Sequence, residues 1–224
     1  MIVVHHLNNS RSQRILWLLE ELALPYEIRR YQRQATMLAP ETLRKVHPLG
    51  KAPVITDGDR VIAESGAILE YLAERYDRQH LLSPQNEEAK LESRYWLHYA
   101  EGSLMPLVVM RLIFSRMGKP PVPWLLRPVG AAFGNGVRKG FIDKQLATHR
   151  QFIEQHLAHR AWFAGEQLSL ADIQMSFPIQ GLAARGGLKE MPATQAWLDK
   201  VTRRPAWQRA IQQGGELDLT GSDN

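Results

Sequence analysis

Residues 50–65 read GKAPVITDGDRVIAES, and this stretch decides the fold of the chain. Two short strand-like runs, 52–56 and 61–63, are separated by an Asp-Gly-Asp tripeptide at 57–59. Asp-Gly between two such runs is a strong signal for a β-hairpin. A helical pattern over 65–75 follows directly, with apolar residues along one side. The stretch therefore predicts a hairpin that passes straight into a helix.

The residues before this hairpin alternate between strand-like and helix-like patterns. Residues 2–7 predict a buried strand, and 12–22 predict an amphipathic helix. A second extended segment begins at 25–28, and a short helix over 41–46 is ended by His47-Pro48. A β-α-β order implies a parallel pair of strands. The first unit is therefore expected to be β-α-β-α-β-β-α.

The remainder of the chain is expected to be helical. Helical patterns cover 87–117, 137–158, 169–184 and 193–212, and the first of them is interrupted at Met105-Pro106. Glycines and prolines punctuate the residues between the first two patterns, and the tail from residue 214 is expected to be mobile.

Two domains follow from these patterns. We expect an α/β domain over 1–78, a linker with a Ser-Pro breaker over 79–86, and an all-helical domain over 87–224. Within the second domain, Ser169 and Asp172 have the Ser-x-x-Asp spacing of a helix N-capping box. We interpret this box as structural.

The chain has no cysteine among its 224 residues, so any thiol chemistry must use a sulfur that a ligand supplies. No apolar run approaches the roughly 20 residues of a membrane-spanning helix, and the N-terminus lacks a signal-peptide pattern. We therefore expect a cytoplasmic protein without a membrane partner. The eight histidines show no metal-ligand spacing, so no metal is expected.

The net charge of +5 has a regional origin. Residues 105–165 hold nine Lys and Arg against two Asp and Glu. These cations are dispersed among prolines, glycines and apolar residues, without a dense basic block or a nucleic-acid motif. A solvated face or attraction of small anions is favoured over nucleic-acid binding, which we do not expect.

Two further features of the opening stretch indicate a binding site. A cis peptide before Pro53, at the start of its strand, would turn the Val54 N–H toward an open edge that an extended peptide can pair with. An ordinary trans proline is the alternative. Ser65 lies where the second hairpin strand passes into a helix, so it either caps the helix or shares an anion site there. Glu64 adds an acceptor for a ligand ammonium group.

A polar turn, HLNNSRSQR at 6–14, joins the first predicted strand to the first predicted helix. A thiol held there would ionise more readily, because the free N–H groups and the positive dipole end of a helix face it. Ser10 can donate its hydroxyl to a thiolate, and Asn9 can donate its amide. Alternatively, these polar residues only cap the helix.

Taken together, the Ser-bearing turn, HPLGKAPVI, AESGAILEYL and FAGEQLSLADI occur in an order that resembles the cytosolic glutathione transferases. The resemblance covers essentially the whole chain and implies a thioredoxin-like N-terminal domain and an all-helical C-terminal domain. The stretch NNSRSQRILWLLEEL is most similar to a bacterial or fungal serine-type branch of this family. Many members have a tyrosine near the first strand and one bacterial class has a cysteine; the turn LNNSRSQR of this chain has neither.

The resemblance also implies roles for individual residues. Glutathione would be bound by Lys51 at its glycyl carboxylate, by Pro53 as the cis-proline, and by the Val54 backbone at its cysteinyl part. The γ-glutamyl end would be held by Glu64 and Ser65. The remaining implied roles are thiol activation by Ser10 or Asn9, an electrophile pocket at Arg11 and Tyr99, and contact of Glu101 with the ammonium group across a dimer interface.

The expected function is that of an enzyme that activates glutathione, its co-substrate, as a thiolate for conjugation to small apolar electrophiles. Peroxidase activity toward organic hydroperoxides belongs to the same hypothesis, and the resemblance implies a homodimer. A non-catalytic binding or regulatory protein of the same fold is the alternative, since fold alone does not determine function. The set Ser10, Lys51, Pro53, Glu64 and Ser65 favours the enzyme.

Overall fold

The computed structural model describes residues 1–34, 36 and 38–219. Its N-terminal part has the predicted order of strands and helices. The elements are β1 (Ile2–Leu7), α1 (Gln13–Glu21), β2 (Tyr26–Tyr31), α2 (Glu41–Arg44), β3 (Val54–Asp57), β4 (Arg60–Ala63) and α3 (Ser65–Tyr76). They form a thioredoxin-like unit around one four-stranded mixed sheet of order β2-β1-β3-β4.

The sheet confirms both predicted pairings. Strands β1 and β2 are parallel, and β3 and β4 form the antiparallel hairpin, with Val54 opposite Ala63. Gly58 has a φ of +60° in the hairpin turn, a conformation that glycine adopts at little cost. Because β1 pairs with the other side of β3, β3 is an interior strand. A peptide ligand can therefore meet Val54 only at the beginning of β3, a smaller opening than the edge that the sequence predicts.

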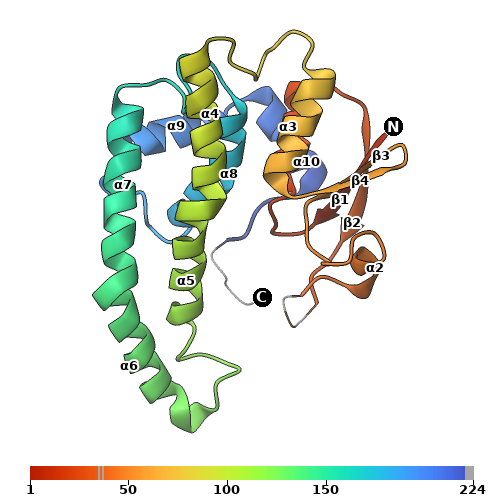
Figure 1. The fold of residues 1–224 in the computed structure, drawn as a ribbon. Coiled ribbons are helices and arrows are strands. Elements are labelled where there is room, and N and C mark those ends of the chain that lie inside the picture. Colours follow the sequence, from red (N-terminus) through yellow and green to blue (C-terminus); the bar gives the residue numbers. More distant parts are fainter. Residues whose placement is uncertain (35, 37, 220–224) are drawn as a thin grey trace.

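Helix α1 is the apolar centre of this unit. All residues from Gln13 to Leu19 are buried, and Ile15, Leu18 and Leu19 are completely so. Helices α1 and α3 lie between the sheet and the helical part of the chain (Figure 1). The turn that precedes α1 is thereby held where the two parts meet.

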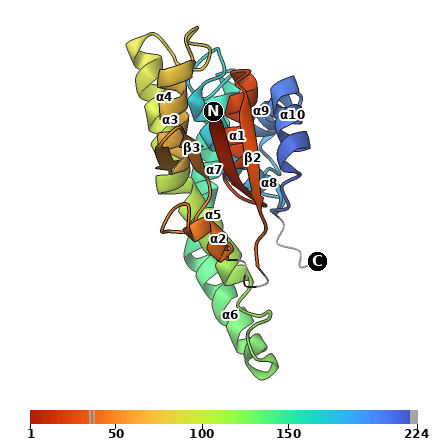
Figure 2. The same cartoon turned by 90° about the vertical axis from the view of Figure 1, so that its right-hand side faces the viewer.

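In the described residues of the C-terminal part, helices joined by loops make up the structure. Its helices are α4 (Glu87–Tyr99), α5 (Met105–Ser115), α6 (Arg127–Val137), α7 (Asp143–Ala158), α8 (Leu170–Ala183), α9 (Pro192–Thr202) and α10 (Pro205–Gly214), with a 3-10 turn over Trp124–Leu126. Helices α5, α6 and α7 extend away from the sheet as a long projection (Figures 1 and 2). Over residues 1–34, 36 and 38–219, no helix has the length and apolarity to cross a membrane.

Helix α8 begins with the predicted capping box. The Asp172 carboxylate accepts from the backbone N–H of Ser169 at 2.9 Å and from its hydroxyl at 2.8 Å. It also accepts from the backbone N–H of Phe163 and the indole N–H of Trp197. Burial raises the pKa of Asp172, and these four donors act against that shift. The box therefore joins α8 to the loop before it and to α9.

Helix α6 (Arg127–Val137) is not predicted by the sequence, because its glycines indicate breaks in a helical pattern. A Cβ on Gly130 would lie 2.1 Å from the carbonyl oxygen of Met117, and a Cβ on Gly134 would lie 2.3 Å from that of Phe114. These glycines let α6 pack closely against the end of α5. The predicted helix over 193–212 is likewise two helices, because Pro205 starts a new one.

The predicted interruption at Met105-Pro106 takes the form of a π-helical turn over Ala100–Leu104, directly before the proline. In this turn the Met105 N–H donates to the carbonyl of Ala100, five residues earlier. Pro106 then lies in the first turn of α5, where a missing N–H is tolerated.

The described part of the expected tail makes hydrogen bonds with the N-terminal part of the chain. The carbonyl oxygen of Gly214 lies 2.8 Å from His6 Nε2, and the Asp218 N–H donates to the Asn9 side chain. The tail therefore returns to the polar turn that precedes α1. Residues 220–224 of the predicted tail lie outside the described residues.

Candidate functional site

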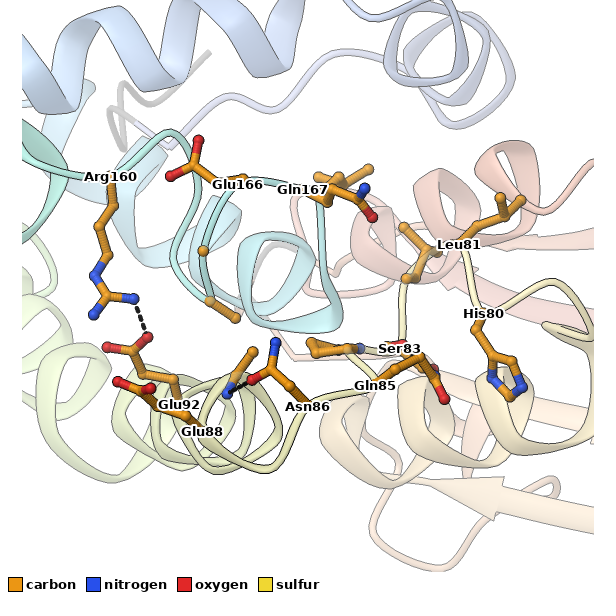
Figure 3. Close-up of a pocket in the computed structure, with 16 residues that line it drawn as sticks. His80, Leu81, Ser83, Gln85, Asn86, Glu88, Glu92, Arg160, Glu166 and Gln167 are labelled. Atoms are coloured by element: carbon orange, nitrogen blue, oxygen red, sulfur yellow. Dashed lines mark hydrogen bonds and ion pairs between the residues drawn. The ribbon is translucent and has the colours of Figure 1, made fainter.

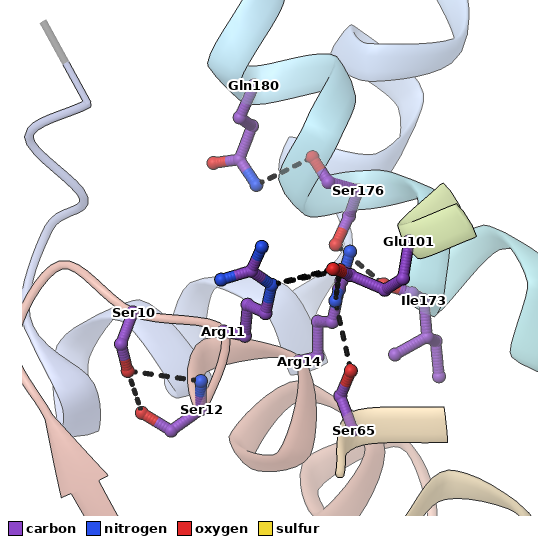
Figure 4. Close-up of polar contacts among 9 residues, drawn as sticks. All are labelled: Ser10, Arg11, Ser12, Arg14, Ser65, Glu101, Ile173, Ser176 and Gln180. Carbon is purple, nitrogen blue, oxygen red and sulfur yellow. Dashed lines mark hydrogen bonds and ion pairs between the residues drawn. The ribbon is translucent and has the colours of Figure 1, made fainter. Parts of the chain in front are cut away.

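The turn between β1 and α1 places Ser10 at the wall of a cavity of about 270 Å³. Its hydroxyl oxygen lies 2.7 Å from that of Ser12, and both residues are buried (Figure 4). Ser12 occupies the N-cap position of α1, and its side chain makes no capping hydrogen bond. Ser10 therefore does more than cap the helix start, because its hydroxyl accepts from the Ser12 N–H at 3.3 Å and also bonds to the Ser12 hydroxyl.

The two asparagines of the turn anchor it to neighbouring segments. Asn8 accepts at 2.8 Å from the backbone N–H of Arg33, and Asn9 accepts at 2.8 Å from the N–H of Asp218. Asn9 has a φ of +50°, a left-handed conformation that asparagine tolerates better than most residues. Its side-chain oxygen is thus bonded to the tail, and Asn9 lines the same cavity as Ser10.

The Ala52–Pro53 peptide bond is cis, in agreement with the first of the two alternatives for Pro53. Pro53 lines a second cavity of about 310 Å³, together with Lys51, Glu64, Ser65 and Glu101. Val54 is completely buried and begins β3 beside this cavity.

The residues Glu64 and Ser65 are arranged differently from a plain helix cap. Glu64 is exposed and has a φ of +71°, and strained backbone of this kind concentrates at functional sites. Ser65 is the first residue of α3, not its N-cap, and its hydroxyl accepts at 3.1 Å from Arg14 Nη1. The prediction that Ser65 caps the helix is therefore wrong, and its hydroxyl instead ends a charged network.

The centre of that network is Glu101, on the π-helical turn before α5. Its carboxylate accepts from Arg14 Nη1 at 2.6 Å and from Arg11 Nε at 2.9 Å (Figure 4). Burial by itself raises the pKa of Glu101, but the two arginines outweigh burial and hold that pKa below its ordinary value. Glu101 is therefore an anion that joins α1 to the helical part of the chain.

Sequence reasoning missed Arg14 as a functional residue. Its side chain is completely buried, and burial lowers the pKa of its guanidinium group to about 10 despite the neighbouring Glu101. Both Nε and Nη2 are buried without a hydrogen-bond partner. The signal was an arginine directly before the apolar run 15–19 of the expected helix, because a charge next to the core is seldom buried without a partner.

The two cavities adjoin, since Arg11, Leu49, Lys51 and Ala52 line both of them. One contains Ser10, and the other contains Pro53, Glu64, Ser65 and Glu101. Arg33 and Arg44 add positive charge to the wall near Ser10. The structure thus brings together most of the site residues that the sequence predicts, in a hollow that is rich in cations.

Tyr99 is the exception, because the structure does not bring it to this hollow. It is 7% exposed and packs against Trp96 and Phe152, and its hydroxyl bonds to His149. Burial raises the pKa of that hydroxyl. The expectation that Tyr99 faces an electrophile is therefore not supported by its position, which is that of a core aromatic residue.

A larger cavity, of about 650 Å³, lies away from this site. It is bounded by the linker, the start of α4 and the loop before α8 (Figure 3). The ion pair between Arg160 and Glu92 crosses its wall. None of the predicted site residues lines this cavity, so its size does not make it the better candidate.

The histidines of β1 point in opposite directions, as expected for neighbours in a strand. His5 bonds to the Tyr31 hydroxyl, whereas His6 bonds to Ser12 and to Gly214. In the described part of the chain, no group of three or more His, Asp or Glu is placed to hold a metal ion.

Fold and site together define a thioredoxin-like protein with an appended helical domain. Residues 1–74 match the glutathione S-transferase N-terminal domain family, and residues 143–205 match the C-terminal domain family. The chain is 38% identical to glutathione S-transferase 3 of Schizosaccharomyces pombe, over 98% of this chain and 90% of that protein. The chain belongs to the glutathione S-transferase family.

Two further relatives agree with this membership. Glutathione S-transferase 1 of Saccharomyces cerevisiae is 34% identical over 97% of each chain. A crystal structure of a glutathione S-transferase from Actinobacillus pleuropneumoniae superposes with a TM-score of 0.79, at 33% identity, over 99% of this chain and 96% of that one. The relatives are thus glutathione transferases over nearly the full length.

Proposed function

We propose that the protein binds glutathione in the two adjoining cavities and activates its thiol for attack on small apolar electrophiles. The observation that carries this proposal is the gathering of Ser10, Lys51, the cis-Pro53, Glu64 and Ser65 around one continuous hollow. Because the chain has no cysteine, the reacting sulfur comes from the ligand. Family membership supports glutathione as that ligand.

The glutathione contacts are assigned from this arrangement. The start of β3 at Val54 pairs with the cysteinyl backbone, and Lys51 pairs with the glycyl carboxylate. Ser65 and Glu64 bind the carboxylate and the ammonium group of the γ-glutamyl end. Glu101 lies in the same cavity, and its contact with a ligand ammonium is proposed for its own or a partner subunit.

Thiol activation is assigned to Ser10, with Asn9 as the alternative donor. Lowering a thiol pKa from about 8.5 to about 6.5 requires roughly 3 kcal/mol of preferential stabilisation of the thiolate. A hydroxyl hydrogen bond to a charged sulfur contributes about 1.5–3 kcal/mol, and a helix N-terminus contributes about 0.3–1 kcal/mol. These two contributions suffice, and with Ser10 as the donor the protein would be a serine-type member of the family.

The electrophile is expected on the Ser10 side of the hollow. There Arg11 and Phe177 line the cavity, and the Arg11 guanidinium lies 5.5 Å from the centre of the Phe177 ring. An apolar ring beside a cation suits an aromatic electrophile that carries a leaving anion. The same thiolate would attack the O–O bond of an organic hydroperoxide, so peroxidase activity belongs to the proposal.

Calorimetric titration with glutathione tests this proposal against a non-catalytic protein of the same fold. We expect binding, and turnover of a chloronitrobenzene and of cumene hydroperoxide. Absence of binding at millimolar glutathione would contradict both the transferase and the peroxidase assignment. Binding without turnover of either substrate would favour the non-catalytic alternative.

Ser10→Ala and Asn9→Ala distinguish the two proposed donors. The variant that removes the donor is expected to raise the thiol pKa of bound glutathione, which the ultraviolet absorbance of the thiolate measures. If neither variant raises it, the assignment of thiol activation to this turn is wrong.

The division into domains 1–78 and 87–224, with the linker 79–86, and the homodimer remain part of the proposal. Exposed apolar side chains on β4 and α4, such as Val61, Leu91 and Tyr95, are consistent with a covered surface. Light scattering at micromolar concentration measures the mass of the particle. A mass of one chain would contradict the homodimer.

A further inference from the structure

A chain of hydrogen bonds leads from the cavity at Ser10 into the interior of the N-terminal domain. Ser12 Oγ lies 2.7 Å from Ser10 Oγ and 2.9 Å from Nδ1 of His6. The other ring nitrogen of His6, Nε2, lies 2.8 Å from the carbonyl oxygen of Gly214. Ser12 is completely buried and His6 is 3% exposed, so the chain beyond Ser10 is shielded from water. Figure 4 shows its outer end at Ser10 and Ser12.

The Gly214 carbonyl determines the direction of every bond in this chain. A carbonyl oxygen only accepts, so His6 Nε2 carries a proton and donates it. Burial lowers the pKa of His6, which leaves the ring neutral at pH 7 with Nδ1 as an acceptor. Ser12 therefore donates its proton to Nδ1, since its other acceptor, the Leu7 carbonyl, is farther at 3.4 Å. Ser12 Oγ is then left to accept the proton of Ser10.

Ser10 accordingly donates its hydroxyl proton to Ser12 Oγ, and not to the cavity. One of its two lone pairs faces the Ser12 N–H at 3.3 Å, and the other remains toward the cavity. In this arrangement Ser10 accepts a hydrogen bond from a thiol in the cavity. It becomes a donor to a thiolate only after its proton has moved to Ser12.

We propose that Ser10, Ser12 and His6 form a proton relay that takes the thiol proton of glutathione to Nδ1 of His6. The inference rests on the proposed function and adds the destination of the proton. The thiol S–H bond breaks as the Ser10 oxygen takes that proton. Ser10 passes its own proton to Ser12, and Ser12 passes its proton to His6. The products are a thiolate that accepts from Ser10 and an imidazolium that donates to Ser12 and to Gly214.

The groups around His6 allow the positive charge of its imidazolium form, but they do not favour that form unless the thiolate is present. Strand β2 contributes the cation of Arg30, which opposes protonation, and α1 contributes the neutral amide of Gln13. The carbonyl at the end of α10 favours the imidazolium. The negative sulfur at the outer end of the relay supplies the compensating charge, so protonation of His6 depends on a ligand with an ionisable thiol.

The relay requires a residue without a side chain at position 214. A Cβ at this position would lie 2.5 Å from Leu16, 2.6 Å from Gln13 and 3.2 Å from the His6 ring. Without a side chain, the end of α10 approaches β1 closely enough for its carbonyl to reach Nε2. The tail thus completes the site, although it lines neither cavity.

The protonation state of His6 is the direct test, because nitrogen NMR distinguishes a neutral ring from an imidazolium. We expect the free enzyme to show the neutral Nε2–H tautomer and the glutathione complex to show the imidazolium. The S-methylglutathione complex is the matched control, since that ligand has no thiol proton, and its His6 is expected to stay neutral. A neutral His6 beside bound, ionised glutathione would overturn the relay and leave the proposed function standing. Failure of glutathione to bind would contradict both.

Variants of Ser12 and His6 measure what the relay contributes. Ser12→Ala removes the middle hydroxyl without removing a helix cap, because this side chain caps nothing. We expect the thiol pKa of bound glutathione to rise by about one unit, which is about tenfold less thiolate below that pKa. His6→Asn retains an acceptor near Ser12, but this acceptor takes up no proton. We expect this variant to raise the thiol pKa of bound glutathione as Ser12→Ala does.

Ser93→Ala, a buried serine on α4, is the control for loss of a buried hydroxyl. It is expected to leave the thiol pKa unchanged. If Ser12→Ala lowers the melting temperature but leaves the thiol pKa of bound glutathione unchanged, Ser12 has only a structural role and the relay is wrong. If Ser12→Ala fails to fold, the NMR comparison on the unaltered enzyme decides the question.

Discussion

Arg14 shows how a single buried charge can connect two parts of this protein. It comes from α1, directly before the completely buried apolar run 15–19, yet it bonds to Ser65 on α3 and to Glu101 beside α5. An unpaired buried guanidinium costs several kcal/mol, so its partners are needed for stability as well as for ligand binding. The site and the interface between the domains therefore depend on the same residue.

Glu101→Gln is expected to destabilise the protein by about 3 kcal/mol, because it leaves the Arg14 cation buried without an anion. Glu92→Gln is the matched control. Its partner Arg160 is partly exposed, and loss of that pair is expected to cost less than about 1 kcal/mol. Urea unfolding at fixed protein concentration measures both variants. Equal losses would contradict the importance assigned to the buried pair.

The same carboxylate predicts a dependence of stability on pH. Arg14 and Arg11 hold the pKa of folded Glu101 below its ordinary value of 4.5, although burial acts the other way. A depressed pKa contributes stability that is present above the unfolded value and is lost as pH falls through the folded value. We therefore expect the stability difference between the unaltered protein and Glu101→Gln to shrink as the pH falls below about 4.5 and through the lowered folded value. A difference that does not change with pH would contradict this.

The glycines of α6 explain why the sequence pattern does not predict this helix. Gly134→Ala is expected to cost about 1–3 kcal/mol, because the added methyl group meets the Phe114 carbonyl at 2.3 Å and forces α5 and α6 apart. Gly136→Ala, in the same helix, meets nothing within 4 Å and is expected to gain up to about 1 kcal/mol from helix propensity. Urea midpoints measure both, and equal effects would contradict the close-packing explanation.

The elements that the sequence predicted well are those whose local signals agree with their surroundings. The hairpin at 57–59, the helix after Ser65 and the capping box of α8 each carry their own turn or cap residues. Helix α6 could not be found in this way, because the reason for its glycines lies in another helix. The division at Pro205 was missed for a simpler reason, since the amphipathic pattern continues across it.

The site was predictable to a similar extent. Residues on the turn, on β3 and at the start of α3 follow from the order of the strands, and the structure gathers them. Glu101 reaches them from a distant segment, and its bonds to Arg11 and Arg14 have no signal in local spacing. The prediction that Tyr99 faces the electrophile is not supported, because an aromatic stripe on a helix more often packs inside a protein than lines a pocket.

The last helix of the chain, α10, packs against the first helix, α1. The Trp17 and Trp207 rings meet edge to face at 4.9 Å, and both side chains are buried. Arg204, directly before α10, donates to both carboxylate oxygens of Glu21 on α1, at 2.6 and 2.8 Å. The C-terminal helix thus belongs by packing to the N-terminal domain, and the two domains share one continuous core.

This shared core predicts that the domains unfold together. Trp207→Ala is expected to cost about 3–5 kcal/mol, because it opens a cavity beside Trp17 at the junction. Hydrogen exchange at amides of β1 and of α7 then reports each domain, and both are expected to lose protection by the same free energy. Trp124→Ala is the control, since that side chain is 72% exposed and its loss is expected to change stability by less than about 0.5 kcal/mol. A continuous core transmits the loss of stability to every element that packs against it. Loss of protection in β1 alone, with α7 unchanged, would therefore contradict the shared core. It would show that the two domains are separate folding units and that α10 stabilises only the first.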